Sequence, residues 1–304
     1  MLRWRLISAG AILAVLLALM WVDYQRLVFD TPGGWLSPLM LVVSALATGE
    51  VLTLLGSNNH QPRAGIVYFG NLLIPLAAAW PIVVRLAGRQ WPAFDALGTC
   101  GLPLAAVAAC MVLVLVGEMA RFSHAGTAIA TAALSMFAIT YVGLLISFWA
   151  LLRLHRNNEW GMMALFSMLL IVKMADAGAF TVGKLIGRHK LTPVLSPGKT
   201  WEGTIGGIFT AGATSWLFFR FGGPAIVGPG YITPSLAAVL TYGVVLALAG
   251  MIGDLAESLL KRDSERKDSS TWLPGLGGVL DIIDAPLVAG PVAWVCWTLG
   301  LLGP

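Results

Sequence analysis

Apolar segments long enough to cross a membrane recur along the whole chain, and they restrict its fold more than any other feature. A transmembrane helix needs roughly 17–25 mostly apolar residues. Only 11% of the 304 residues are charged, against about 25% in ordinary globular domains. The sequence therefore predicts an all-α, polytopic integral membrane protein with about nine transmembrane helices. The nine segments are 6–22, 36–55, 67–87, 97–119, 125–152, 160–186, 203–221, 235–260 and 283–302.

The distribution of basic residues predicts how these helices are oriented. Arg3 and Arg5 precede the first segment, but no small-residue cleavage pattern follows it, so we expect an uncleaved helix. With a cytoplasmic N-terminus, eleven Lys and Arg residues fall on the cytoplasmic side and six on the other. This excess favours that orientation, and both polar loops of the C-terminal half then face the cytoplasm. We divide the chain into five N-terminal spans, residues 1–155, and four C-terminal catalytic spans, residues 156–304.

Residues 253–284 concentrate charge beside apolar segments. They hold seven of the fifteen carboxylates, interleaved with four Lys and Arg residues. Metal ions, phosphates or water must stabilise such charge at a membrane. Asp254, Ser258 and Lys261 share one helix face, with Glu257 beside them. This face can bind a divalent cation and a phosphate together, and the alternative is a solvated, salt-bridged helix end.

The same stretch ends in a glycine-rich turn and two aspartates. Three glycines within residues 275–278 let a ligand approach the backbone closely. Asp281 and Asp284 are one helical turn apart at the start of the last segment. We predict that Asp281 and Asp254 bind a metal, and that Asp284 either supports them or caps the helix. Hard oxygen ligands suit Mg²⁺, which also binds substrate phosphates.

The sixth segment and the loop after it carry a second polar group. Lys173 and Asp176 lie three residues apart in an apolar helix, so they either neutralise each other or contribute to a polar cavity. Small residues at four-residue spacing, from 175 to 187, predict a close helix-packing face. We expect Thr200 to cap the seventh helix. The loop has the residue types of a phosphate cradle, without being a Walker A motif: Ser196, Gly198, Lys199 and Thr200.

Two acidic residues lie within apolar segments of the N-terminal half. Glu50 and Glu118 either form hydrogen bonds across the helix bundle or extend a polar pocket. The four histidines lie on separate polar connections and suggest no pair of metal ligands.

Two motifs together resemble the phosphatidate cytidylyltransferase family, also called CDP-diacylglycerol synthase. The first runs from Asp176 to Gly203 and includes the sequence SPGKTWEG. The second runs from Gly253 to Asp268 and continues from Pro274 to Asp284. The positions that match the second motif are Ser258, Lys261, Arg262, Lys267, Asp268, Gly277, Gly278, Asp281 and Asp284.

The resemblance implies transfer of CMP from CTP to phosphatidate, which gives CDP-diacylglycerol and pyrophosphate. It implies Mg²⁺, with a second cation as an open question, and a homodimer in the bilayer. It also implies a bacterial inner membrane location with the active site on the cytoplasmic side, and we expect no nucleic-acid partner. The catalytic residues that it implies are Asp254, Asp281, Lys199 and Lys261, with Asp284 as a further metal ligand. The substrate-binding residues are Ser196, Thr200, Ser258, Arg262, Lys267, Asp268, Gly277, Gly278 and Asp176.

The chain departs from the family pattern at three positions. Leu276 replaces a usual His, Ile282 replaces an Arg, and Ala285 replaces a frequent Ser. Loss of positive charge beside the closing aspartates weakens phosphate binding or changes the substrate, unless neighbouring cations compensate.

Three alternatives to this function stay open. The first is a CTP-dependent kinase or cytidylyltransferase that acts on another membrane lipid. The second is an ion-coupled transporter, which predicts interrupted helices in two similar halves, whereas the polar residues here gather in the C-terminal half. The third is an inactive, lipid-binding homologue.

Overall fold

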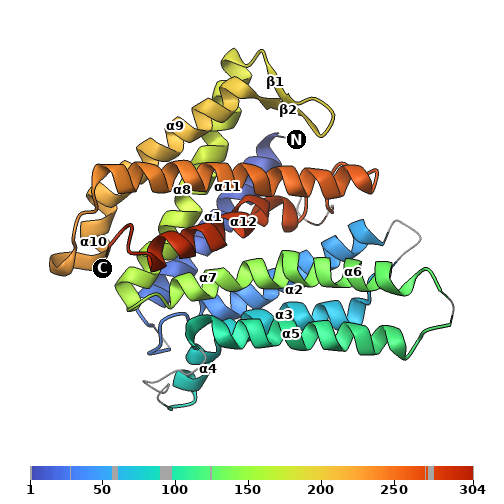
Figure 1. Ribbon diagram of the computed structural model, residues 1–304. Coiled ribbons are helices and arrows are strands. Elements are labelled where there is room, and N and C mark those ends of the chain that lie inside the picture. The colour runs from blue at the N-terminus through green and yellow to red at the C-terminus, as the bar shows by residue number, and fades with distance from the viewer. Residues whose placement is uncertain are drawn as a thin grey trace. The chain divides into compact units, whose positions relative to one another are not determined.

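The regular elements that the computed structural model describes are helices, apart from one short hairpin (Figure 1). It describes residues 2–27, 29–56, 61–89, 98–123, 125–270, 272 and 277–303. The chain forms two compact units. Unit 1 comprises Met1–Leu151 and Asp263–Ile282, and unit 2 comprises Leu152–Arg262 and Ile283–Pro304. The division of roles between residues 1–155 and 156–304 stays a prediction.

Unit 1 is built around helix α3. Helix α3 packs against α2, α5 and the π-helical segment η1. Proline lacks a backbone N–H and bends helices, and Pro75 and Pro81 flank a 67° bend between α3 and α4. The bend lies within the third predicted span, residues 67–87. The helices are α1 (Leu2–Tyr24), α2 (Leu36–Leu55), α3 (Ala64–Ala78), α4 (Trp80–Leu86), α5 (Gly98–Met119), α6 (Ala128–Ala138), η1 (Ile139–Leu144) and α7 (Leu145–Arg153), the last reaching the boundary of unit 2.

Unit 2 contains the longest helices and the hairpin. Strands β1 and β2 are antiparallel, with Lys190 opposite Thr200 and Thr192 opposite Ser196. The sequence predicted only an irregular polar loop there. The elements are α8 (Asn158–Ile186), β1 (Lys190–Thr192), β2 (Ser196–Thr200), α9 (Trp201–Leu217), η2 (Phe218–Gly222), α10 (Gly223–Val227), η3 (Gly228–Gly230), α11 (Leu236–Asp263) and α12 (Leu280–Thr298), and the unit boundaries cut the end of α11 and the start of α12.

Six helices of the described part of the chain are long and apolar enough to cross a membrane. The number becomes seven if the bent pair of α3 and α4 forms one span. The protein is therefore an integral membrane protein. Of the other predicted spans, α1 has a shorter apolar stretch, Ser8–Tyr24, and α9 ends at Leu217 where η2 begins.

Helices α8 and α9 pack along each other through small residues, as the spacing predicted (Figure 1). A Cβ atom placed on Gly203 would lie 2.8 Å from the carbonyl oxygen of Ala179. One placed on Gly207 would lie 3.0 Å from the carbonyl oxygen of Ala175. The glycines of α9 therefore face the small residues of α8, and this close packing fixes the start of α9 and the hairpin before it.

We expect Gly203→Ala to destabilise the protein by about 1–3 kcal/mol, because the added methyl group overpacks the α8–α9 contact. Gly212→Ala in the same helix is the matched control, since its nearest neighbour, Leu240, lies at an ordinary 3.6 Å. The control should be stabilising by about 0.5–1 kcal/mol, because alanine favours a helix more than glycine does. Thermal unfolding in detergent measures both variants, and equal effects would contradict the packing.

Candidate active site

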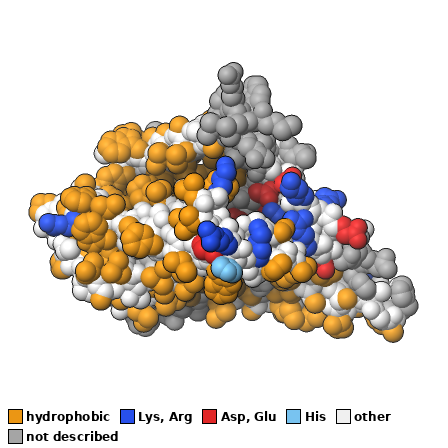
Figure 2. Space-filling model, turned by 90° about the horizontal axis from the view of Figure 1, so that it is seen from above, with side chains coloured by type: hydrophobic (Ala, Val, Ile, Leu, Met, Phe, Trp, Pro, Cys, Tyr) orange, Lys and Arg blue, Asp and Glu red, His pale blue; other side chains and the backbone are white. Residues whose placement is uncertain are grey.

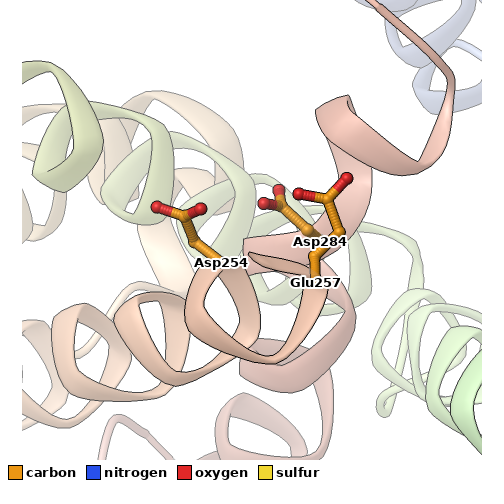
Figure 3. Close-up of side chains that lie close together, drawn as sticks. All are labelled: Asp254, Glu257 and Asp284. Carbon is orange, nitrogen blue, oxygen red and sulfur yellow. The ribbon is translucent and has the colours of Figure 1, made fainter. Parts of the chain in front are cut away.

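Three carboxylates lie together in unit 2, two from α11 and one from α12. Figure 3 shows Asp254, Glu257 and Asp284 side by side. One oxygen from each lies within 4.8 Å of the others. Asp254 and Glu257 are three residues apart and share a helix face. Gly253 lets the two helices approach, because a Cβ atom there would overlap the carbonyl oxygen of Asp284.

The three carboxylates are held away from water to different degrees. Glu257 is 1% exposed and Asp284 is 6% exposed, while the side chain of Asp254 is 38% exposed. Like charges so close together in an apolar setting repel strongly unless cations compensate them. The group therefore needs positive partners.

Two lysines bind this carboxylate group. The Lys199 Nζ atom lies 2.7 Å from Asp254 Oδ2, and the Lys261 Nζ atom lies 2.5 Å from Glu257 Oε2. Lys261 comes from the next turn of α11, whereas Lys199 comes from β2. The ammonium nitrogen of Lys199 is buried. The two lysines predicted to be catalytic are thus in direct contact with the acidic group.

Contacts with α11 and α9 hold the hairpin in place, and the hairpin thereby positions Lys199 beside Asp254. Arg262 Nε donates to the carbonyl oxygen of Leu195, at 3.4 Å. Thr200 Oγ1 accepts the Gly203 amide at 3.1 Å, which confirms Thr200 as the cap of α9. The hydroxyl of Thr200 therefore has a structural role in the described contacts.

Helix α8 adds a further ion pair to this region. Lys173 Nζ and Asp176 Oδ2 lie 3.7 Å apart, and both side chains are partly exposed. Asp176 is within electrostatic range of Asp254 and Lys199, and Lys173 is within range of Asp284. Four carboxylates thus face three ammonium groups. In Figure 2, Lys and Arg side chains gather beside Asp and Glu side chains on one face.

The donor set of this group fits a hard divalent cation. Mg²⁺ prefers carboxylate oxygens and retains coordination positions for water and phosphate oxygens. Three carboxylates in mutual reach supply the oxygens, and the excess of negative charge favours a cation. Asp254, Glu257 and Asp284 could therefore hold Mg²⁺, although Mn²⁺ satisfies the same preference.

Asp281 lies in the first turn of α12, in unit 1, and organises the loop before it. Its Oδ2 atom accepts the Gly278 amide at 2.6 Å and the Ser269 hydroxyl at 2.7 Å. Gly277 has a φ of +88°, and a Cβ atom there would overlap the Asp281 carboxylate. These contacts are those of a helix-capping residue. The pairing of Asp281 with Asp254 in one metal site stays a prediction.

The chain was compared with known proteins. Its sequence matches the cytidylyltransferase family over residues 3–299. The chain belongs to this family. A phosphatidate cytidylyltransferase of Haemophilus influenzae is 41% identical over 131 residues, which cover 43% of this chain and 44% of that protein. One of Mycobacterium bovis is 32% identical over 233 residues, 72% of each chain. The uncharacterized protein YnbB of Escherichia coli is 35% identical over 182 residues, 59% of this chain and 56% of YnbB.

The other predicted site residues differ in how exposed they are and in which unit they lie. Ser258 is buried in α11, one turn after Asp254, and Ser196 is half-buried in β2. Lys267 and Asp268 are exposed in unit 1. Of the three departures from the family pattern, Leu276 lies outside the described residues. Ile282 is half-buried in the first turn of α12, and Ala285 is buried.

Two contacts of the site region were missed by sequence reasoning. The sequence analysis placed Glu257 on the helix face of Asp254 but did not include it among the predicted metal ligands. Its position one turn from Asp254 was a usable signal. The second contact joins His189 Nδ1 to Glu202 Oε1, at 2.6 Å. This hydrogen bond, together with backbone amides, lowers the pKa of Glu202 to about 2. Thirteen residues separate the pair, a spacing that carries no local signal.

Proposed function

We propose that this protein transfers CMP from CTP to phosphatidate, which forms CDP-diacylglycerol and pyrophosphate at a membrane surface. Membership of the cytidylyltransferase family and the names of its relatives support this activity. In the chain itself, the supporting observation is the group of Asp254, Glu257 and Asp284 with Lys199 and Lys261 bound to it. A phosphate-transfer site needs both a hard cation and ammonium groups.

The reaction requires no nucleophile from the protein. An oxygen of the lipid phosphate attacks the α-phosphorus of CTP in line. The bond from that phosphorus to the bridging oxygen breaks, and pyrophosphate leaves with the electron pair. Positioning and charge stabilisation supply most of the acceleration. When bound, Mg²⁺ would neutralise phosphate charge and polarise the phosphorus–oxygen bonds.

The lysines have a defined task in this account. Lys199 and Lys261 now neutralise Asp254 and Glu257. When CTP binds, the two ammonium groups exchange these carboxylates for phosphate oxygens, and the carboxylates with Asp284 are then available for the cation. Asp254 and Glu257 would each have a cationic partner in both states, a lysine before the exchange and the bound cation after it, so neither of these two carboxylates would be left uncompensated.

The resemblance assigns further residues to this reaction, and these assignments remain proposals. Asp281 is a further metal ligand in this account, and a second cation stays an open possibility. Arg262 and Thr200 also have the structural contacts described above. The proposed substrate-binding residues are Ser196, Thr200, Ser258, Arg262, Lys267, Asp268, Gly277, Gly278 and Asp176.

The proposed membrane arrangement has nine spans and a cytoplasmic N-terminus. The continuation of α9 into η2 supports the predicted span at residues 203–221. The excess of basic residues supports the orientation. We also propose that the protein acts as a homodimer in a bacterial inner membrane, with CTP bound from the cytoplasm, because nucleotides are available there.

Labelled CTP distinguishes the proposed reaction from its alternatives. Purified protein is incubated with Mg²⁺, a lipid acceptor and CTP labelled at either the α- or the γ-phosphorus. We expect α-label in the lipid when phosphatidate is the acceptor, and none after chelation of the metal. γ-Label transferred to diacylglycerol would instead indicate a kinase. α-Label transferred only to another lipid phosphate would indicate a different acceptor, which the aliphatic residues at 276 and 282 would favour.

A further inference from the structure

A carboxylate from α2 binds the start of α12 within unit 1. Glu50 is 8% exposed and lies in the C-terminal half of the apolar helix α2. Its Oε1 atom accepts the Val279 amide, and its Oε2 atom accepts the Leu280 amide, both at 2.8 Å. Oε2 also accepts the hydroxyl of Ser269 at 2.8 Å. Both oxygens of one buried carboxylate are thus used by a segment more than 200 residues away, which confirms the hydrogen bonding expected for Glu50.

The hydroxyl of Ser269 connects Glu50 to Asp281. It lies 2.8 Å from Glu50 Oε2 and 2.7 Å from Asp281 Oδ2. A serine hydroxyl has one proton to donate, so the two carboxylates share it. Asp281 also accepts the Gly278 amide, and Glu50 accepts the amides of the next two residues. Glu50 and Asp281 therefore hold Ser269 and residues 278–280 together at the start of α12.

The chemistry of these contacts requires a carboxylate on α2. Three donors converge on Glu50, two of them backbone amides at a helix N-terminus, where negative charge is favoured. Glutamine would present one oxygen and an NH₂ group that points a donor at another donor. A buried carboxylate in an apolar helix is costly unless all its hydrogen bonds are made. The hydrogen bonds of Glu50 hold the backbone next to Gly277, Gly278 and Asp281.

We propose that Glu50 is a positioning residue for CMP transfer. It holds Ser269 and residues 278–280 in the conformation that the reaction needs, acting through the Ser269 hydroxyl and the backbone amides rather than touching a substrate. This inference rests on the proposed function, because the resemblance assigns residues of this loop to the substrates. The N-terminal half of the chain thereby contributes directly to the arrangement of a catalytic loop.

Kinetics of three variants test the role of Glu50. We expect Glu50→Gln to lower kcat by about 10–100-fold with a smaller change in KM for CTP, as is usual for residues that orient a ligand-bearing group. Glu50→Asp keeps the charge and should recover part of the loss. Glu118→Gln is the control: Glu118 is a buried carboxylate of the same unit that pairs with Arg63 through two hydrogen bonds. It should lower thermal stability without a comparable loss in kcat.

A labelling measurement reports on the loop independently of activity. A cysteine at position 270, in a chain whose three native cysteines are replaced, should react faster with a maleimide in Glu50→Gln than in the parent. Faster labelling with a lower kcat supports the proposal, whereas unchanged kcat overturns it.

If Glu50→Gln does not fold, Ser269→Ala removes one of the three hydrogen bonds and should show a smaller loss of kcat. Absence of transfer in the parent would reject the proposed function itself, and equal activity of parent and variants would reject only the role of Glu50.

Discussion

Replacement of Asp254 by Asn is expected to lower magnesium-dependent CMP transfer by at least about 10²–10³-fold, the scale of losing one electrostatic group from an active site. Asparagine offers one neutral oxygen in place of a charged pair, so the cation and Lys199 both lose their partner. Glu257→Gln and Asp284→Asn should give losses of similar size, because all three carboxylates belong to one group. Transfer of α-label from CTP to phosphatidate measures the effect.

The matched control for these three variants is Asp30→Asn. Asp30 has a fully accessible carboxylate, with a side chain that is 96% exposed and an ion pair to Arg26 at 4.0 Å. Such surface pairs contribute little, so the control should retain full activity. Size-exclusion chromatography and thermal unfolding show whether each variant is folded. Activity within a factor of about two of the parent in folded Asp254→Asn would remove Asp254 from the proposed site.

Lys199→Gln should change metal binding and CMP transfer in opposite directions. The variant loses a charge-assisted interaction with phosphate, worth about 1.5–3 kcal/mol, so we expect transfer to fall by about 10–150-fold. The affinity of the variant for Mn²⁺ in the absence of nucleotide should rise, because the ammonium group that forms an ion pair with Asp254 has been removed. Electron paramagnetic resonance of Mn²⁺ titrated into the protein measures this affinity.

Lys184→Gln serves as the control for general loss of a positive charge. Lys184 is near the end of α8, where its Nζ atom lies 5.8 Å from the ring centre of Phe180. We expect both Mn²⁺ affinity and CMP transfer to stay close to those of the parent. A fall in both quantities for Lys199→Gln would mean that the lysine supports the fold of the site instead of exchanging partners.

Much of the fold could be predicted from the sequence, because apolar length and helix-breaking residues are local properties. The segment 36–55 coincides with α2, and the prolines at 75 and 81 explain the bend between α3 and α4. The β1–β2 hairpin could not be predicted, since β1 has only three residues and the five residues of β2 include a proline and a glycine. The end of α9 at Leu217 is set by the π-helical turn that follows, which apolar composition does not reveal.

The sequence could predict part of the site because it places several of the residues on one helix face. Asp254, Glu257 and Lys261 were placed on one face in this way, whereas the approach of Asp284 to them depends on how closely α11 and α12 pack at Gly253. The capping contacts of Asp281 depend on the backbone conformation at Gly277. The partners of Glu50 lie in the other half of the chain, so no local pattern could indicate them.

The central claim is that Asp254, Glu257 and Asp284 hold the cation of a cytidylyltransferase. Anomalous diffraction at the manganese edge tests it most directly, with crystals of the full chain grown in Mn²⁺ and a non-reactive CTP analogue. The account predicts an anomalous peak bounded by oxygens of these three carboxylates and by phosphate oxygens of the nucleotide. A nucleotide-bound structure whose manganese peak lies on other residues, with this group still paired to Lys199 and Lys261, would contradict it.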